Sequence, residues 1–172
     1  MRNTLPATRC GVTEFRWGSK TYIMGICNLS PDSFSGDGLG PDVPATLAQA
    51  KRMVAEGADI IDVGGESTRP GTDPTPDVSA ELSLVIPAIR ALAAELDVPI
   101  SIDTYKSAVA VEALKAGASI INDIWGLKFD PSLATVAAEA GAPIILMANE
   151  RDAPPKAGIL AKVMADLRYG IE

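Results

Sequence analysis

Histidine is absent from this chain of 172 residues. Its absence excludes histidine metal ligands, a histidine general base and a Ser-His-Asp triad. The chain has two cysteines, Cys10 and Cys27, whose spacing fits neither a zinc site nor a redox pair. Two cysteines do not make a disulfide framework either, so the familiar histidine- and cysteine-based sites are excluded.

Long hydrophobic runs and an excess of positive charge are also missing. No apolar run reaches about 18 residues, so we expect no membrane span. Residues 1–11 lack the apolar segment of a signal peptide, and the cytoplasm is the expected location. A net charge of −7 argues against nucleic-acid or anionic-membrane binding, and an anionic substrate would need local cations. With 47% hydrophobic and 22% charged residues, the chain has the composition of one globular domain, 1–172.

What the sequence does contain is a strand–helix unit repeated five times. Short apolar runs predict buried strands, and helical spacing of apolar residues follows each of them. Three junctions share one pattern, in which a glycine closes a helix before a strand begins. We expect Asp130 to cap the fourth helix, and the same role is open to Thr104 at the third. The predicted strands are 22–27, 60–63, 99–102, 119–121 and 143–147, and the helices follow them at 44–56, 77–96, 105–116, 131–140 and 159–169.

Alternation of strands and helices predicts an α/β fold with a parallel sheet and right-handed crossovers. Runs such as Ile60-Ile61 fit strands buried on both faces. No Gly-x-Gly-x-x-Gly opens the first helix, which disfavours a dinucleotide-binding sheet. We therefore favour a (β/α)8 barrel of the TIM type, of which this chain carries about five units, over an open doubly wound sheet.

An anion site is predicted directly after the second strand. Gly64 and Gly65 permit close approach to their backbone, and Thr68 and Arg69 then offer a hydroxyl and a planar fork of donors. Such groups suit phosphate oxygens. The alternative is a plain turn with a solvated arginine.

Polar residues also end or follow the other predicted strands, where barrel enzymes carry their catalytic groups. Each has a structural alternative: Asn28 could cap a turn, Asp103 could cap the third helix, and Asn122 could satisfy loop backbone. Lys106 and Lys115 are interpreted as solvated helix charges. The residues at or after strand ends are Asn28, Glu66 to Arg69, Asp103, Asn122, Asp123 and Asn149.

Two long segments resemble the signatures of the dihydropteroate synthase family. They are Ile-Met-Gly-Ile-Cys-Asn-Leu-Ser-Pro-Asp-Ser-Phe-Ser at 23–35 and Asp-Val-Gly-Gly-Glu-Ser-Thr-Arg-Pro-Gly at 62–71. Ser-Ile-Asp-Thr-Tyr-Lys at 101–106, Ile-Asn-Asp-Ile at 121–124 and Ile-Ile-Leu-Met at 144–147 resemble its next three strand ends. The resemblance runs in order from about residue 21 to 152.

The resemblance implies a transferase of folate biosynthesis that joins p-aminobenzoate to 6-hydroxymethyl-7,8-dihydropterin diphosphate and releases diphosphate. It also implies small-molecule substrates, no nucleic-acid or membrane partner, and a homodimer in the full-length family. By match of motif, Asn28 would help hold Mg²⁺ against the diphosphate. Asp103 and Arg69 would act in catalysis, and the substrate-binding residues would be Thr68, Asp103, Asn122, Met147, Phe34 and Pro70.

The chain also departs from the family pattern. Gly36-Asp37-Gly38 replaces the usual Asp-Gly-Gly, and Ala148 stands where a histidine is common. A full barrel needs about 250 residues, so the family's polar groups after strands six to eight have no counterpart here. We expect an incomplete pterin-binding domain that is inactive alone. A non-catalytic pterin-binding fragment and a methyltetrahydrofolate–corrinoid methyltransferase-like barrel remain alternatives, and the Ser-Thr-Arg-Pro-Gly segment argues against the methyltransferase.

Overall fold

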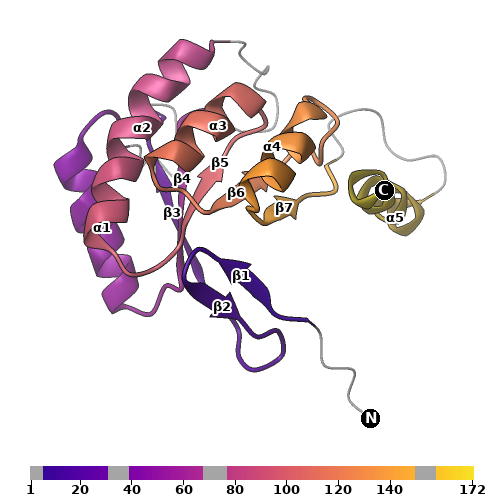
Figure 1. Ribbon diagram of the computed structural model, residues 1–172, viewed down its shortest axis with the longest axis horizontal. Coiled ribbons are helices and arrows are strands. Elements are labelled where there is room, and N and C mark those ends of the chain that lie inside the picture. Colours follow the sequence, from indigo (N-terminus) through magenta and orange to yellow (C-terminus); the bar gives the residue numbers. More distant parts are fainter. Residues whose placement is uncertain (1–5, 31–38, 68–76, 150–157) are drawn as a thin grey trace.

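The computed structural model describes residues 6–30, 39–67, 77–149 and 158–172, and the statements below concern these residues. A five-stranded parallel sheet forms its centre, and a small antiparallel hairpin precedes it (Figure 1). The hairpin strands are β1 (Thr8–Cys10) and β2 (Thr13–Phe15). The sheet consists of β3 (Met24–Asn28), β4 (Ile60–Gly64), β5 (Ile100–Asp103), β6 (Ile120–Asp123) and β7 (Ile144–Leu146).

The five strands lie side by side in chain order, β3-β4-β5-β6-β7. A doubly wound sheet would reverse this order at a switch point, whereas a (β/α) barrel adds each strand beside the previous one. The structure therefore confirms the predicted fold class, with five units of the barrel type. The helices that follow the strands are α1 (Val43–Ala55), α2 (Val78–Glu95), α3 (Ser107–Ala116), α4 (Ser132–Ala140) and α5 (Ile159–Ile171).

Aspartates fix the beginnings of the first two helices. The carboxylates of Asp42 and Asp77 accept hydrogen bonds from the backbone amides of Ala45 and Ala80, each at 2.9 Å. Such caps satisfy amides that have no partner within the helix. Gly117 ends α3 at a φ of 120°, a conformation that side chains disfavour. No helix among the described residues is both long and apolar enough to cross a membrane.

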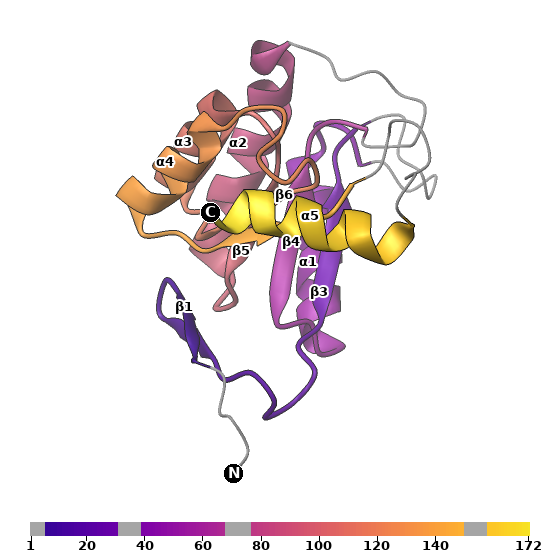
Figure 2. The same ribbon diagram turned by 90° about the vertical axis from the view of Figure 1, so that its right-hand side faces the viewer.

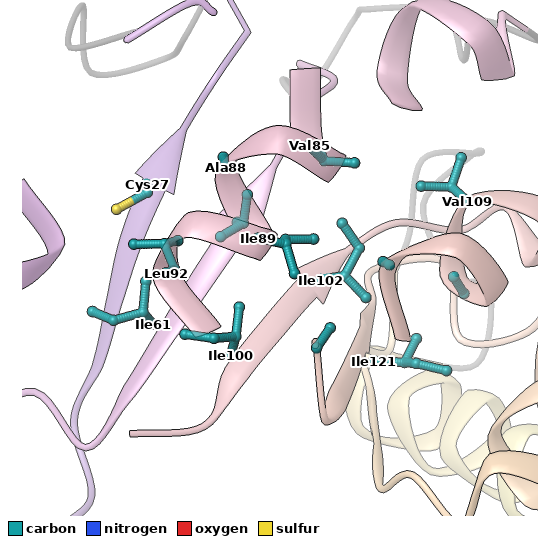
Figure 3. Packing of buried hydrophobic residues seen from close by; sticks show 14 of the residues in the cluster. Cys27, Ile61, Val85, Ala88, Ile89, Leu92, Ile100, Ile102, Val109 and Ile121 are labelled. Atoms are coloured by element: carbon teal, nitrogen blue, oxygen red, sulfur yellow. The ribbon is translucent and has the colours of Figure 1, made fainter. Parts of the chain in front are cut away.

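The main core lies between the sheet and α1 to α4. Alternate residues of each strand face these helices, and Val63, Ile102 and Ile121 are fully buried there. Figure 3 shows Ile102 beside Ile89 of α2, and Ile61 and Ile100 beside Leu92 of the same helix. We call this side of the sheet the outer face and the opposite side the inner face. In Figure 1, α5 lies beyond β7 at one end of the sheet, and Figure 2 shows it in yellow in front of the strands.

The hairpin of β1 and β2 covers the amino-terminal end of the strands, and the sequence did not predict it. Cys10 and Phe15 are buried against Ile60 and Ile120, the first residues of β4 and β6. Gly11 turns the hairpin at a φ of 59°. Because each strand has three residues, their apolar pattern is too short to distinguish from a loop.

The third helix begins two residues later than expected. The Thr104 hydroxyl accepts from the Lys106 amide at 3.3 Å and forms a turn, so it does not cap α3. The Asp130 carboxylate takes that role, accepting from the Ser107 amide at 2.9 Å. It also accepts from the Ser132 amide at 3.1 Å, which confirms its predicted place at the start of α4.

Candidate functional site

Four residues form one row across the carboxyl ends of four strands. Asn28 pairs in register with Gly64, Gly64 with Asp103, and Asp103 with Asn122. Residues paired in this way in a parallel sheet point to the same face. The row lies on the inner face, since the neighbouring residues Cys27, Val63 and Ile102 point into the core. Three side chains that the sequence singled out are thus brought together.

Gly64 lies between two of these side chains in the row. A Cβ placed on Gly64 would lie 3.5 Å from Asp103 Oδ2 and 3.9 Å from Asn28 Oδ1. Because Gly64 has no side chain, both oxygens border the same position beside the buried backbone of β4. Two acceptor oxygens gathered in this way suit a partner that carries hydrogen-bond donors or a cation.

Asp103 is the one acid of the row, and its pKa is strongly perturbed. Burial raises the pKa of Asp103 well above its ordinary value, and the neighbouring carboxylates of Asp62, Glu81, Asp123 and Glu66 raise it further. Asp103 Oδ1 is buried without a hydrogen-bond partner among the described residues. An unpaired buried acceptor is costly, and such atoms mark sites that a ligand completes. Asp103 caps no helix, because Asp130 occupies the start of α3.

The neighbouring Asp123 has a structural role. Its carboxylate accepts from the Trp125 amide at 2.8 Å and the Leu127 amide at 2.7 Å. It thereby fixes a turn in which Leu127 adopts a φ of 66°. Met147 lies beside this turn, because its amide donates to the Asp123 carbonyl oxygen. The Met147 side chain is 43% exposed and therefore available to a ligand.

Lys106 is buried, and its interpretation as a solvated helix charge is wrong. Its side chain is 6% exposed and its ammonium contacts Glu66 Oε2 at 2.5 Å and Glu81 Oε2 at 2.8 Å. The Tyr105 hydroxyl donates to Glu66 Oε1 at 2.6 Å. This cluster ties the end of β4 to α2 and α3. Lys115, in contrast, is 66% exposed as expected.

Sequence comparison links this geometry to known proteins. The pattern that defines the pterin binding enzymes matches residues 24–168, most of the chain. The chain belongs to the pterin-binding enzyme family. The match spans the five strands of the sheet, α1 to α4, most of α5 and every residue of the row.

Three relatives illustrate the similarity. Dihydropteroate synthase from Clostridium beijerinckii is 47% identical over 160 residues, which cover 93% of this chain and 59% of the relative. The structure of the Clostridium difficile enzyme with pteroic acid superposes with a TM-score of 0.82 at 46% identity, covering 91% of this chain and 59% of that one. The Xanthomonas albilineans enzyme with 4-aminobenzoic acid gives a TM-score of 0.78 at 41% identity, covering 89% and 55%. The chain spans about half the length of curated relatives such as the Clostridium beijerinckii enzyme, at 59%, and the Bacillus subtilis enzyme, at 45%.

Within this pterin-binding family member, the predicted site residues fall into two groups. Asn28, Asp103 and Asn122 share the row, and Met147 follows the adjacent strand β7. The other predicted site residues, Phe34, Thr68, Arg69 and Pro70, lie outside the described residues.

Sequence reasoning gave no role to Asp62, nor to the ion cluster of Lys106. Asp62 is 2% exposed, and its Oδ2 accepts from Asn122 Nδ2 at 3.2 Å. Its signal in the sequence was a lone acid within the apolar run from Ile60 to Val63. Acids are seldom buried without a role, so that position could have been flagged.

Proposed function

We propose that this chain provides the pterin-binding part of a dihydropteroate synthase. Such an enzyme condenses 6-hydroxymethyl-7,8-dihydropterin diphosphate with p-aminobenzoate to 7,8-dihydropteroate and diphosphate. The single observation that carries the proposal is the row of Asn28, Gly64, Asp103 and Asn122 at the carboxyl edge of the sheet. A pterin edge carries an amino group and a ring N–H, which are donors for the carboxyl of Asp103 and the amide oxygen of Asn122.

The chemistry requires no enzyme nucleophile. The bond between the pterin methylene carbon and the diphosphate oxygen breaks, and its electron pair leaves with the diphosphate. The aniline nitrogen of p-aminobenzoate then bonds to the methylene carbon and loses a proton. Arg69, which follows β4 in the sequence, would stabilise the departing charge, and Thr68 would hydrogen-bond the same oxygens.

The site suits Mg²⁺ only when the phosphates of the substrate supply further oxygen ligands. Among the described residues, no three Asp, Glu, Cys or His side chains are arranged to hold a metal ion. Mg²⁺ is commonly held by one or two protein oxygens together with substrate phosphates and water. Asn28 Oδ1 beside the bare backbone of Gly64 offers one such oxygen. Mg²⁺ would neutralise charge on the diphosphate, while Asn28 orients it.

The second substrate would approach from the loops after β3 and β4. The Xanthomonas albilineans relative binds 4-aminobenzoic acid, which supports an aminobenzoate site in this family. In this chain, Phe34 and Pro70 would form its walls, and Met147 would contact the pterin ring.

Replacing Arg69 with lysine tests the diphosphate assignment. The change keeps the charge but loses the bidentate fork. Titration calorimetry should show weaker binding of the pterin diphosphate, by about tenfold, with unchanged binding of the pterin alcohol. Equal losses for both ligands would contradict a diphosphate contact by Arg69.

Activity is tested on the 172-residue polypeptide alone and with the remaining barrel of a relative added as a second polypeptide. We expect dihydropteroate only from the mixture, because the family's groups after the sixth to eighth strands are then present. Product from the single polypeptide would show that its own residues suffice. Transfer of a methyl group from a methylated folate, without dihydropteroate, would favour the methyltransferase alternative.

A further inference from the structure

Asp62 lies directly below the row of Asn28, Gly64, Asp103 and Asn122, and it is buried on the inner face. It is two residues before Gly64 on β4, and side chains two apart on a strand share a face. In register it stands between Ile26 and Ser101. Asp62 is only 2% exposed, so a ligand cannot approach its carboxyl from solvent.

The Asp62 carboxyl contacts one member of the row. Asn122 Nδ2 donates to Asp62 Oδ2 at 3.2 Å, across 60 residues of sequence. The side-chain amide of asparagine is planar, and its donor nitrogen and acceptor oxygen point in different directions. When the nitrogen faces Asp62, the carbonyl oxygen therefore faces away from it.

Asp62 favours one of the two orientations of the Asn122 side-chain amide. A carboxylate can only accept hydrogen bonds, so an amide oxygen turned toward it would be repelled. Burial raises the pKa of Asp62, and hydrogen bonds with the Ser101 and Asn122 side chains lower it in part. A proton on Oδ1 would still leave Oδ2 as an acceptor for Asn122.

We propose that Asp62 is a positioning residue that presents the Asn122 carbonyl oxygen, and not its amide nitrogen, to the ligand. Asn122 and Asp103 then form a continuous acceptor surface, adjacent in register at the ends of β5 and β6. Such a surface selects a heterocycle whose edge carries donors and rejects one with a carbonyl oxygen in place of the amino group. The inference rests on the proposed function for the identity of the ligand as a pterin.

The unpaired acceptor of Asp103 supports this assignment independently. Asp103 Oδ1 is buried and accepts no hydrogen bond from the described residues. A ligand that satisfied it would have to bring a donor. An Asn122 amide nitrogen turned toward the same ligand edge would oppose that donor, whereas the carbonyl oxygen matches it.

The test uses Asp62→Asn, which keeps the shape but allows residue 62 to donate. Binding of 6-hydroxymethylpterin and of 6-hydroxymethyllumazine, which has a carbonyl oxygen in place of the 2-amino group, is measured by calorimetry. We expect the preference for the pterin to fall by about tenfold, since one mismatched hydrogen bond is worth about one decade. General damage to the fold would weaken both ligands alike and leave the ratio unchanged, which would overturn the proposal.

Two further variants separate orientation from stability. Asp59→Asn changes an acid at the other end of β4, where it contacts Lys20 and the Ile23 amide, and should leave the preference unaltered. The exchange Asp62→Asn with Asn122→Asp again places an acceptor before the ligand and should restore the preference. If the double variant preferred the pterin over the lumazine no more than Asp62→Asn alone does, the inference would be refuted.

A measurement without ligand keeps the inference distinct from the proposed function. Nuclear magnetic resonance reports the side-chain amide protons of Asn122, which should shift upfield in Asp62→Asn when the carboxylate no longer accepts from them. Unmoved signals would overturn the positioning role. If the Asn122 signals shift in Asp62→Asn as expected but the parent protein binds neither pteridine, the proposed function is refuted instead.

Discussion

Replacing Lys106 with methionine removes the ammonium that lies between Glu66 and Glu81. The three side chains are 6, 10 and 3% exposed, so the two carboxylates cannot turn to water without opening the structure. Methionine preserves the length of the apolar stem and deletes the charge. The change therefore isolates the electrostatic part of the cluster.

The expected loss of stability is about 3 kcal/mol at pH 7. Breaking a buried ion pair by removing one partner costs roughly 3–5 kcal/mol. The carboxylates can reduce that cost by taking up a proton. Protonating one glutamate with an ordinary pKa of 4.5 costs about 3.4 kcal/mol at pH 7, at about 1.36 kcal/mol per pH unit. Glu81 is the better candidate, because burial already raises its pKa despite Lys106, whereas Tyr105 still donates to Glu66.

The pH dependence of this loss depends on the protonation of Glu81. Without Lys106, the pKa of Glu81 in the folded protein rises further above 4.5, so the variant loses stability relative to the parent as pH rises through that value. At pH 5, protonation costs only about 0.7 kcal/mol. The difference between variant and parent should shrink to about 1 kcal/mol.

Urea unfolding followed by circular dichroism at pH 5 and pH 7 measures both differences. Lys115→Met is the matched control, since Lys115 pairs with Glu112 on the surface of α3, at 66 and 47% exposure. Exposed pairs contribute about 0–1 kcal/mol. A Lys106 variant within 1 kcal/mol of the control at pH 7, or one with equal losses at both pH values, would refute the account of a buried charge cluster.

Two further substitutions test the site and the helix starts. Asp103→Asn should stabilise the protein at pH 8 and leave its stability nearly unchanged near pH 4, because an acid whose pKa is raised from 3.8 by burial weakens the fold as pH rises. A change in thermal unfolding of equal size at both pH values would contradict this. The same variant should bind pterin more weakly. Asp130→Ala should cost about 1–2 kcal/mol and increase hydrogen exchange at both the Ser107 and Ser132 amides; an effect at Ser132 alone would show that Asp130 does not support α3.

The order of the five strand–helix units could be predicted from local sequence, but the hairpin of β1 and β2 could not. Apolar runs, helical spacing and closing glycines are local signals, and all five strand–helix units are present. Element ends were less certain, as the start of α3 shows. Asp130, which serves that start, lies 23 residues further along the chain. A local pattern cannot contain such a partner.

The family, the barrel type of the fold and the polar residues at the strand ends could all be predicted from motifs and hydrophobic periods, which are properties of the chain alone. Which of these residues share a face, and what each one contacts, became known from the folded arrangement. Parallel register aligns Asn28, Asp103 and Asn122, and it brings Asp62 to Asn122. Lys106 is buried because its partners come from segments 25 and 40 residues away. Burial and pairing depend on what lies opposite a side chain, and that is set by the packing of distant segments.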